Sequence, residues 1–198
     1  MKVKCAILIP VAASALLVAG CSSGSSDSVP TSLTITQATP AMEGGVCPEA
    51  DPAVTTGPQW TISGATGKLA VAAATDTAGP LIKVTAPFSV DETQVKTLEA
   101  GTGKEITDEM AVNVCYEGVD GRDGQVFDSS FQRGTPLRLR TDGVVPGFRR
   151  ALVGQRVGAS VAVAMTPDDG YPDGSPDGTI KPGDTIIFVL KIMAAEKV

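Results

Sequence analysis

The sequence predicts an α+β fold, in which an antiparallel β-sheet packs on one short α-helix. The second half of the 198-residue chain holds several segments in which apolar and polar side chains alternate, which is the period of a strand. A single segment there has apolar residues at helical spacing, and stretches rich in Gly, Pro and Asp separate the segments as turns do. The length suffices for one ordinary core, and no internal repeat indicates a second domain.

The first strands are expected before the middle of the chain. Residues 81–84 and 90–98 alternate loosely, and we expect each to be a strand. Residues 110–117 alternate more strictly, which predicts a half-buried strand with one wet face. Turn-forming residues at 120–124 are followed by an apolar pair within 125–127, so these two segments are expected to form a hairpin.

The helix is expected after a further short strand. Leu137 and Leu139 alternate with arginines, which is typical of a strand with one solvent-exposed face. Apolar residues within 145–152 have the spacing of one helical face, with Pro146 close to the start and Gly154 beyond the end. This segment predicts a short helix, and the only one.

Two strands are expected at the end of the chain, at 161–165 and 186–192, separated by a long loop at 166–184. Long loops in compact domains are more often functional than not. Residues 173–184 have the alternating oxygen side chains of a calcium-binding loop, but two prolines restrict the backbone and no helices flank it. We therefore interpret it as a turn-rich loop and predict no metal.

The first residues resemble an export signal. Two lysines precede an apolar run at 6–18, which is short for a membrane span. The run ends in Val-Ala-Gly-Cys, which resembles the cleavage box of bacterial lipoproteins, so residues 1–20 are interpreted as a lipoprotein signal peptide and Cys21 as the acylated residue. The alternative is a plain secretory signal with an incidental cysteine. A lipid-anchored protein outside the cytoplasm is the expectation.

Residues 21–57 are rich in Ser, Thr, Pro and Gly without a sustained apolar period, which predicts a flexible tether or an irregular arm. The folded domain is expected at 58–198, with its catalytic core at about 95–196. The sequence leaves open whether residues 58–98 extend the main sheet or only wrap it.

Composition excludes several functions. The chain contains no histidine, which removes Ser-His-Asp and Cys-His catalysis and histidine-ligated metals. Without the two lysines of the signal, 14 basic residues remain against 22 acidic ones, a net charge of about −8. Nucleic acid is not an expected partner, because phosphate binding needs a basic surface.

Two cysteines remain beyond Cys21. Cys47 and Cys115 are free to pair in an exported protein, which would join the N-terminal segment to the domain. Sequence cannot show that their Cα atoms approach closely enough, so two unpaired thiols are the alternative.

Five blocks of residues resemble those of FKBP-type peptidyl-prolyl cis/trans isomerases in order and spacing, over about residues 95–192. They are Tyr116-Glu117-Gly118, Gly124-Gln125-Val126-Phe127-Asp128-Ser129-Ser130, Val144-Val145-Pro146-Gly147-Phe148, Ala151-Leu152-Val153-Gly154-Gln155-Arg156-Val157-Gly158 and residues 167–171. The resemblance implies a curved antiparallel sheet wrapped around one short helix, with an apolar pocket at one end.

The resemblance also implies which residues form the site. The catalytic set is expected to comprise Tyr116, Phe127, Asp128, Val145, Phe148, Tyr171 and Phe188. Further substrate-binding residues are expected to be Val144, Leu137, Ile180 and Arg133, the last paired with Asp128. Two positions depart from the family: Phe148 replaces its usual tryptophan, and Leu137 replaces a common aromatic residue. Both changes keep the pocket apolar while altering its shape.

The implied activity is isomerisation of Xaa-Pro bonds in exported proteins, which requires no cofactor. The alternative is a non-catalytic FKBP-like module that binds proline-bearing segments as a chaperone. A purely structural surface lipoprotein would leave the five ordered blocks unexplained. The expected partners are proline-containing polypeptides, macrolide inhibitors and, through acylated Cys21, the membrane, and the protein is expected to be a monomer.

Overall fold

The computed structural model describes residues 45–49 and 57–198. The expected signal peptide, the expected lipidation site Cys21 and most of the expected tether at 21–57 lie outside the described residues. Within the described part of the chain, no helix is both long and apolar enough to cross a membrane.

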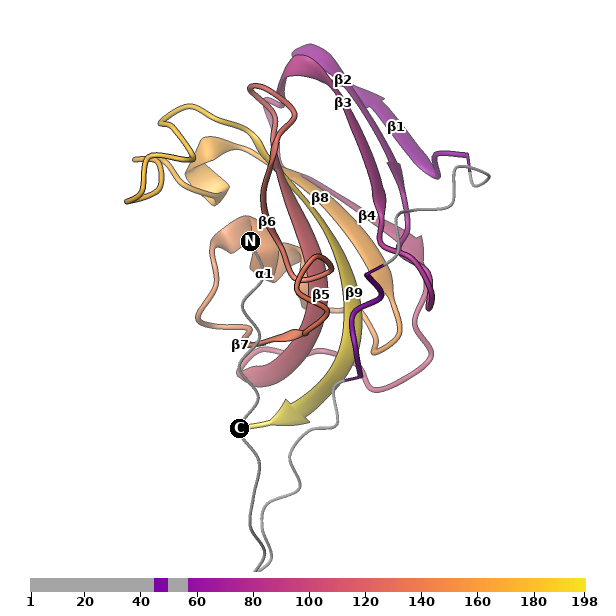
Figure 1. Ribbon diagram of the computed structural model, residues 1–198. Helices are drawn as coiled ribbons and strands as arrows, with labels where there is room; N and C mark the ends of the chain where they lie inside the picture. The colour runs from indigo at the N-terminus through magenta and orange to yellow at the C-terminus, as the bar shows by residue number, and fades with distance from the viewer. Residues whose placement is uncertain (1–44, 50–56) are drawn as a thin grey trace, which may run out of the picture. The chain divides into compact units, whose positions relative to one another are not determined.

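The main sheet is antiparallel and curved (Figure 1). Its strands follow the order β4-β8-β9-β5-β6, and β7 pairs with β5 beyond the end of β6. The bounds are β4 (Gln94–Glu99), β5 (Met110–Asp120), β6 (Val126–Ser129), β7 (Leu137–Arg140), β8 (Ser160–Met165) and β9 (Ile186–Lys197). The hairpin of β5 and β6 confirms the prediction from the turn residues between them.

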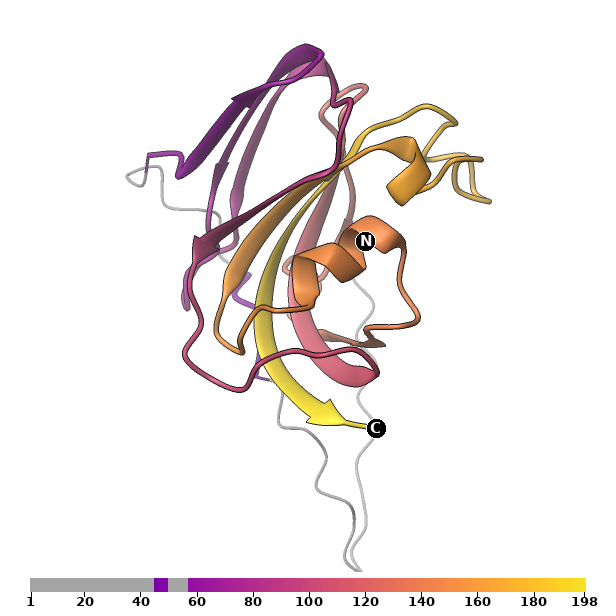
Figure 2. The ribbon, with the colours of Figure 1, turned by 180° about the vertical axis from the view of Figure 1, so that it is seen from behind.

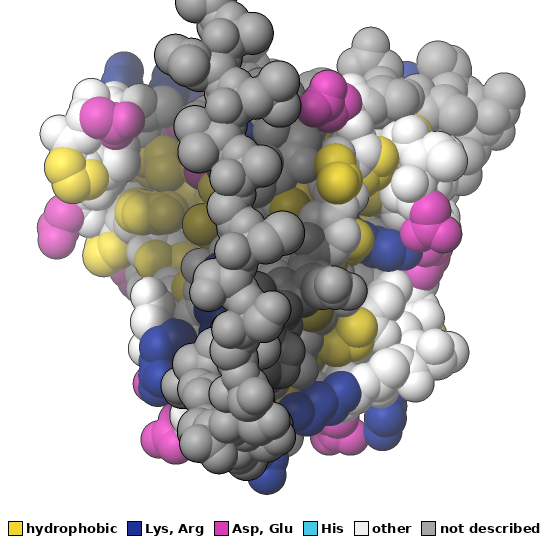
Figure 3. All heavy atoms as spheres, turned by 60° about the horizontal axis from the view of Figure 1, so that its bottom comes forward, with side chains coloured by type: hydrophobic (Ala, Val, Ile, Leu, Met, Phe, Trp, Pro, Cys, Tyr) yellow, Lys and Arg dark blue, Asp and Glu magenta, His cyan; other side chains and the backbone are white. Residues whose placement is uncertain are grey.

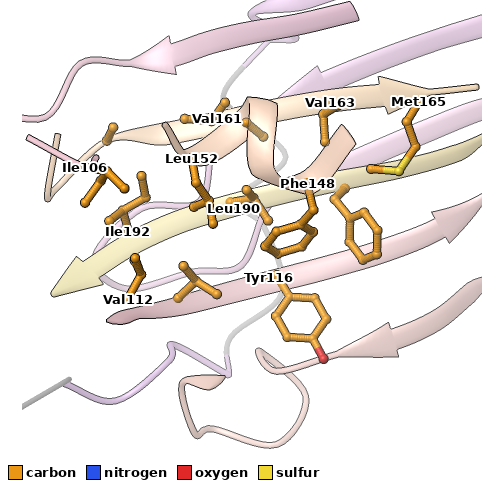
Figure 4. Close-up of a cluster of buried hydrophobic side chains, with 14 of the residues drawn as sticks. Ile106, Val112, Tyr116, Phe148, Leu152, Val161, Val163, Met165, Leu190 and Ile192 are labelled. Carbon is orange, nitrogen blue, oxygen red and sulfur yellow. The ribbon is translucent and has the colours of Figure 1, made fainter. Parts of the chain in front are cut away.

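The helix α1 (Pro146–Leu152) lies in the concave side of this sheet (Figure 2). Pro146 begins it, a position where its missing N–H costs no helical hydrogen bond. Phe148, Ala151 and Leu152 are buried against the inner side chains of the sheet (Figure 4). The fold is thus α+β, as predicted, and α1 is the only α-helix among the described residues, joined by one 3₁₀ turn, η1 (Pro167–Asp169).

A second sheet covers part of the outer face of the first. It consists of β1 (Trp60–Ser63), β2 (Thr66–Ala72) and β3 (Leu81–Ser89), paired antiparallel in that order. Leu69 and Phe88 from this sheet pack with Ile187 and Val189 of β9, all of them buried. The region 58–98 therefore contributes a separate layer, and only β4 joins the main sheet. The second layer is required because β8 and β9 are apolar on both faces.

Two expectations about strands were wrong in detail. The strand expected at 90–98 is β4 at Gln94–Glu99, because β3 continues to Ser89 and the residues between form a turn. The wet face expected for residues 110–117 does not exist, because Cys115 is covered by Cys47 and Phe131 in a separate buried cluster. The strict alternation predicted the strand correctly, but it could not predict the cluster of Cys47, Cys115 and Phe131 on its outer side.

Charges of both signs lie interspersed over the face drawn in Figure 3, in its described part. Several exposed arginines of the domain form ion pairs. Arg138 pairs with Glu196, and Arg156 pairs with Glu105. The chain as a whole is acidic, but basic side chains lie among the acidic ones on this face.

Candidate active site

A pocket of about 280 Å³ opens where β5, β6 and β7 meet the start of α1 and the loop after β8. Nine of its eleven lining residues are apolar or aromatic. The lining residues are Tyr116, Phe127, Asp128, Leu137, Leu139, Gly143, Val144, Val145, Phe148, Tyr171 and Phe188. The structure thus brings together nine of the residues that the sequence nominated, and adds Leu139 and Gly143, for which no sequence signal was recognised.

Phe188 is at the centre of the aromatic side chains. Its ring centroid lies 5.0 Å from that of Phe148, 5.5 Å from that of Phe127 and 5.9 Å from that of Tyr116, all in edge-to-face geometry. Tyr116 and Phe148 also meet edge to face, at 6.3 Å. Edge-to-face contacts add to the stabilisation that the aromatic rings gain from being buried. The four rings come from β5, β6, α1 and β9, so the pocket depends on the whole curved sheet.

Gly118 allows two of these rings to approach the backbone of β5. It lies opposite Phe188 in the register of β5 and β9. A Cβ atom at this position would lie 2.6 Å from Phe127 Cζ and 2.6 Å from Phe188 Cε1, closer than carbon atoms can pack. Sequence reasoning gave Gly118 no role. An isolated glycine within a strand often marks such a close approach, and this signal could have identified it.

A polar network forms one rim of the pocket. The Tyr116 hydroxyl donates to the carboxylate of Asp128, and the Arg133 guanidinium donates both to that carboxylate and, at 2.9 Å, to the Tyr116 hydroxyl oxygen. The guanidinium carbon also lies 5.7 Å from the Tyr116 ring centroid. Burial, together with the hydrogen bond to Asp128, raises the pKa of Tyr116 to about 12. The phenol therefore stays protonated at neutral pH and holds the carboxylate in one orientation.

Tyr171 and Val145 bring two further polar groups to the pocket. Tyr171 follows η1, and burial, with the nearby charge of Asp128 as a second cause, raises the pKa of its phenol. Within the described residues, neither the Tyr171 hydroxyl nor the backbone N–H of Val145 has a hydrogen-bond partner. Both groups therefore remain able to donate to a ligand.

Two nominated residues lie elsewhere. Ile180 does not line the pocket: its side chain is buried in the core and contributes to a neighbouring hollow of about 260 Å³ that shares Phe127, Asp128 and Tyr171. Arg133 does not line the pocket either, and acts on it through Asp128 and Tyr116. Neither residue lines this pocket, and their expected contact with a ligand stays a prediction.

The acidic loop that resembles a calcium site has internal partners. Asp177 accepts hydrogen bonds from the N–H and the hydroxyl of Thr179, at 3.1 and 2.9 Å, and Asp184 accepts from Arg122 and from the Lys181 N–H. Among the described residues, no group of three or more His, Cys, Asp or Glu side chains is arranged to hold a metal ion. These carboxylates shape the loop.

Comparison with known proteins places this pocket in a family. Residues 103–193 match the family model of the FKBP-type peptidyl-prolyl cis-trans isomerases. The peptidyl-prolyl cis-trans isomerase Mip of Coxiella burnetii is 34% identical over 106 residues, which are 52% of this chain and 45% of that protein. The FK506-binding protein of Streptomyces anulatus is 33% identical over 103 residues, which are 50% of this chain and 83% of that protein.

Among solved structures, FkpA from Escherichia coli is similar with a TM-score of 0.50 and 32% identity, covering 53% of this chain and 48% of that one. The chain spans less than half the length of the Mip and FkpA proteins that it matches. The Streptomyces relative, by contrast, is matched over 83% of its length. The pocket residues all lie within residues 103–193, the segment that matches the family model. This chain therefore belongs to the FKBP-type peptidyl-prolyl cis-trans isomerase family.

Proposed function

We propose that this protein catalyses cis/trans isomerisation of Xaa-Pro peptide bonds in polypeptides outside the cytoplasm, and so assists their folding. The observation that carries the proposal is the ring-lined pocket of about 280 Å³ around Phe188. The Tyr171 hydroxyl and the Val145 N–H lie at its edge and have no hydrogen-bond partner in the described part of the chain. The pocket lies within the part of the chain that matches the isomerase family.

The chemistry requires no reactive side chain. Amide resonance gives the Xaa-Pro bond a rotational barrier of about 18–20 kcal/mol, while its two isomers differ by only about 1 kcal/mol. Rotation passes through a twisted amide whose carbonyl is less polar than in the planar form. A pocket that removes the amide from water takes away the hydration that favours the planar form, and thereby favours the twisted one.

The residues divide this task. Phe127, Phe148 and Phe188 hold the prolyl ring, the Val145 N–H donates to a substrate carbonyl, and the Tyr171 hydroxyl orients the peptide. Asp128 does not transfer a proton, because its carboxylate is held by Tyr116 and Arg133 and the reaction moves no proton. It fixes the geometry of the rim.

An isomerisation assay tests the proposal directly. The rate of cis-to-trans conversion of a proline-containing tetrapeptide is measured without protein, with the wild-type protein, and with the variants Tyr171→Phe and Phe127→Ala. Acceleration by the wild-type protein that falls in both variants supports catalysis. If the rates with and without wild-type protein are equal while the peptide still binds, the protein is a binding module instead.

The proposed location rests on other observations. The structure contains a disulfide between Cys47 and Cys115, which suits an oxidising compartment outside the cytoplasm. One relative, from Legionella longbeachae, is named outer membrane protein MIP. We infer that acylated Cys21 holds the protein to the membrane surface. The variant Cys21→Ser should then appear in the soluble fraction after cell lysis, and its continued recovery with membranes would argue against the lipid.

Macrolides are the proposed inhibitors, because the Streptomyces relative is named for binding FK506. Phe148 lines the pocket where the family usually has a tryptophan, and a phenylalanine ring offers a ligand less apolar surface than an indole does. We expect FK506 to inhibit the isomerase reaction and Phe148→Trp to strengthen inhibition. Equal inhibition of both proteins would show that position 148 does not control macrolide binding.

A further inference from the structure

A short N-terminal segment, residues 45–49, lies along the main sheet (the dark segment beside β9 in Figure 1). We refer to it as the arm. Its Cys47 is fully buried and forms the disulfide with Cys115, the neighbour of Tyr116 in β5. The arm precedes the family-matched segment, which begins at residue 103, so its contacts are additional to the part of the chain shared with the family model.

The arm holds the loop that carries Arg133. This loop, residues 130–134, is referred to as the rim loop. The Cys47 N–H donates to the Gly134 carbonyl at 3.1 Å, and Cys47 Sγ lies 3.6 Å from Ser130 Oγ. Phe131, from the same loop, is buried with Cys47 and Cys115 in one cluster. Both ends of the rim loop thus contact the arm.

The rim loop in turn connects to the pocket. Ser130 Oγ accepts the backbone N–H of Tyr116 at 2.7 Å, and the Ser130 N–H donates to the Tyr116 carbonyl at 2.9 Å. Three residues further on, Arg133 donates to Asp128 and to the Tyr116 hydroxyl. Arg133 is half-exposed, so its own packing does not fix its position. A half-exposed arginine needs its backbone held if it is to keep a defined pair of hydrogen bonds.

We propose that the disulfide-linked arm is a positioning element of the active site: by fixing Ser130 and Gly134, it holds Arg133 against Asp128 and Tyr116 at the pocket rim. The inference rests on the proposed isomerase function for its kinetic test. No residue of the arm lines the pocket.

A double-mutant cycle tests the coupling. Values of kcat/KM are measured for the wild type, Arg133→Met, the pair Cys47→Ser/Cys115→Ser, and the triple variant. The arginine variant and the serine pair are each expected to lower kcat/KM by about fivefold, and the triple variant is expected to fall little further, because coupled residues are non-additive. Additive losses, about 25-fold in the triple variant, would overturn the proposal, since general destabilisation would give that result.

A second measurement uses the wild-type chain and is independent of catalysis. Trypsin cuts after Arg133 only when the rim loop opens, so cleavage there, identified by mass spectrometry, reports on the loop. Reduction of the disulfide is expected to speed this cut by about tenfold relative to cleavage after Arg156, which pairs with Glu105 away from the arm. Equal acceleration at both sites, or none, would contradict the proposal. An inactive oxidised wild type with arm-dependent cleavage would refute the isomerase function alone.

Discussion

At the scale of single residues, the pocket depends on where side chains are absent as well as on where they are present. Phe127 and Phe188 approach each other across Gly118, and no larger residue fits beneath them. The rings would have to move if a side chain were added. A glycine in β5 costs the strand some stability, which the close packing of the rings offsets.

The variant Gly118→Ala is expected to lower kcat/KM about tenfold, because displacing catalytic groups by about 1 Å can cost up to ~100-fold. Overpacking should also reduce the free energy of unfolding by about 1–3 kcal/mol. Peptide kinetics and urea unfolding measure the two effects. Gly57→Ala is the matched control, because no atom of the described residues lies within 4 Å of the Cβ position there. Full activity in Gly118→Ala would show that the ring positions are not critical.

Because of Tyr116, the free energy of unfolding is expected to depend on pH in the alkaline range. The folded protein keeps the phenol proton up to a pKa of about 12, whereas an exposed tyrosine has a pKa of 10.0. The unfolded chain therefore loses the proton first, and the stability contributed by this group is complete below pH 10 and falls as the pH rises towards 12. Tyr116→Phe lacks this contribution, so its urea midpoint should fall less than that of the wild type between about pH 9 and about pH 11. Parallel declines would contradict the assignment.

At the scale of elements, the long loop between β8 and β9 is held to the β5–β6 turn by one arginine. Arg122 donates to Asp120 and Asp184, whose carboxylates are nearly buried, and to the Thr179 carbonyl. Burial raises the pKa of Asp120. Burial acts in the same direction on Asp184, but hydrogen bonds from Lys181, Asp120 and Arg122 bring its pKa below the ordinary value. The ion pairs of Arg122 with Asp120 and Asp184 thereby hold the loop that carries Tyr171 in place.

The variant Arg122→Gln leaves these two buried carboxylates without their cation and should lower the midpoint of urea unfolding at neutral pH. The matched control is Arg156→Gln, which breaks an exposed pair with Glu105 and should cost at most about 1 kcal/mol. The difference between the variants should shrink as the pH is lowered, because Asp120, with its raised pKa, takes up a proton before an ordinary aspartate does. Equal midpoints at neutral pH would show that the cluster does not fix the loop.

At the scale of the whole described domain, two layers have different tasks. The main sheet and α1 enclose the pocket, whereas the sheet of β1, β2 and β3 covers the opposite face of β8 and β9. Leu69 is completely buried in this outer layer. The outer layer should therefore contribute stability without taking part in catalysis.

The variant Leu69→Ala is expected to reduce the free energy of unfolding by about 2–5 kcal/mol, since it leaves a cavity in a closed cluster. The kcat/KM of the folded fraction should stay within about twofold of the wild type, because the cluster around Leu69 and the lining of the pocket have no residue in common. Thr61→Ala, on the exposed side of β1, is the control for stability. A large activity loss at a temperature where the variant is folded would couple the outer layer to the pocket.

The main elements could be predicted because their signals are local. Each of these signals depends on a few neighbouring residues. Alternation at 110–117 indicated β5, Pro146 marked the start of α1, and the turn residues at 120–124 indicated the hairpin of β5 and β6. Resemblance then supplied the set of residues around the pocket, of which Ile180 and Arg133 lie outside it. The placement of those two residues depends on the conformation of loops, which periodicity does not encode.

By itself, the sequence determined the α+β class and the strands and helix of the main sheet, and its resemblance to a known family indicated most of the residues that line the pocket. Only the tertiary structure decided that β1, β2 and β3 form a second layer, that β5 is buried on both faces, and that Cys47 meets Cys115 across 68 positions of the chain. The reason is that strand period and turn chemistry depend on adjacent residues, whereas layers and cross-links depend on which distant surfaces can bury each other.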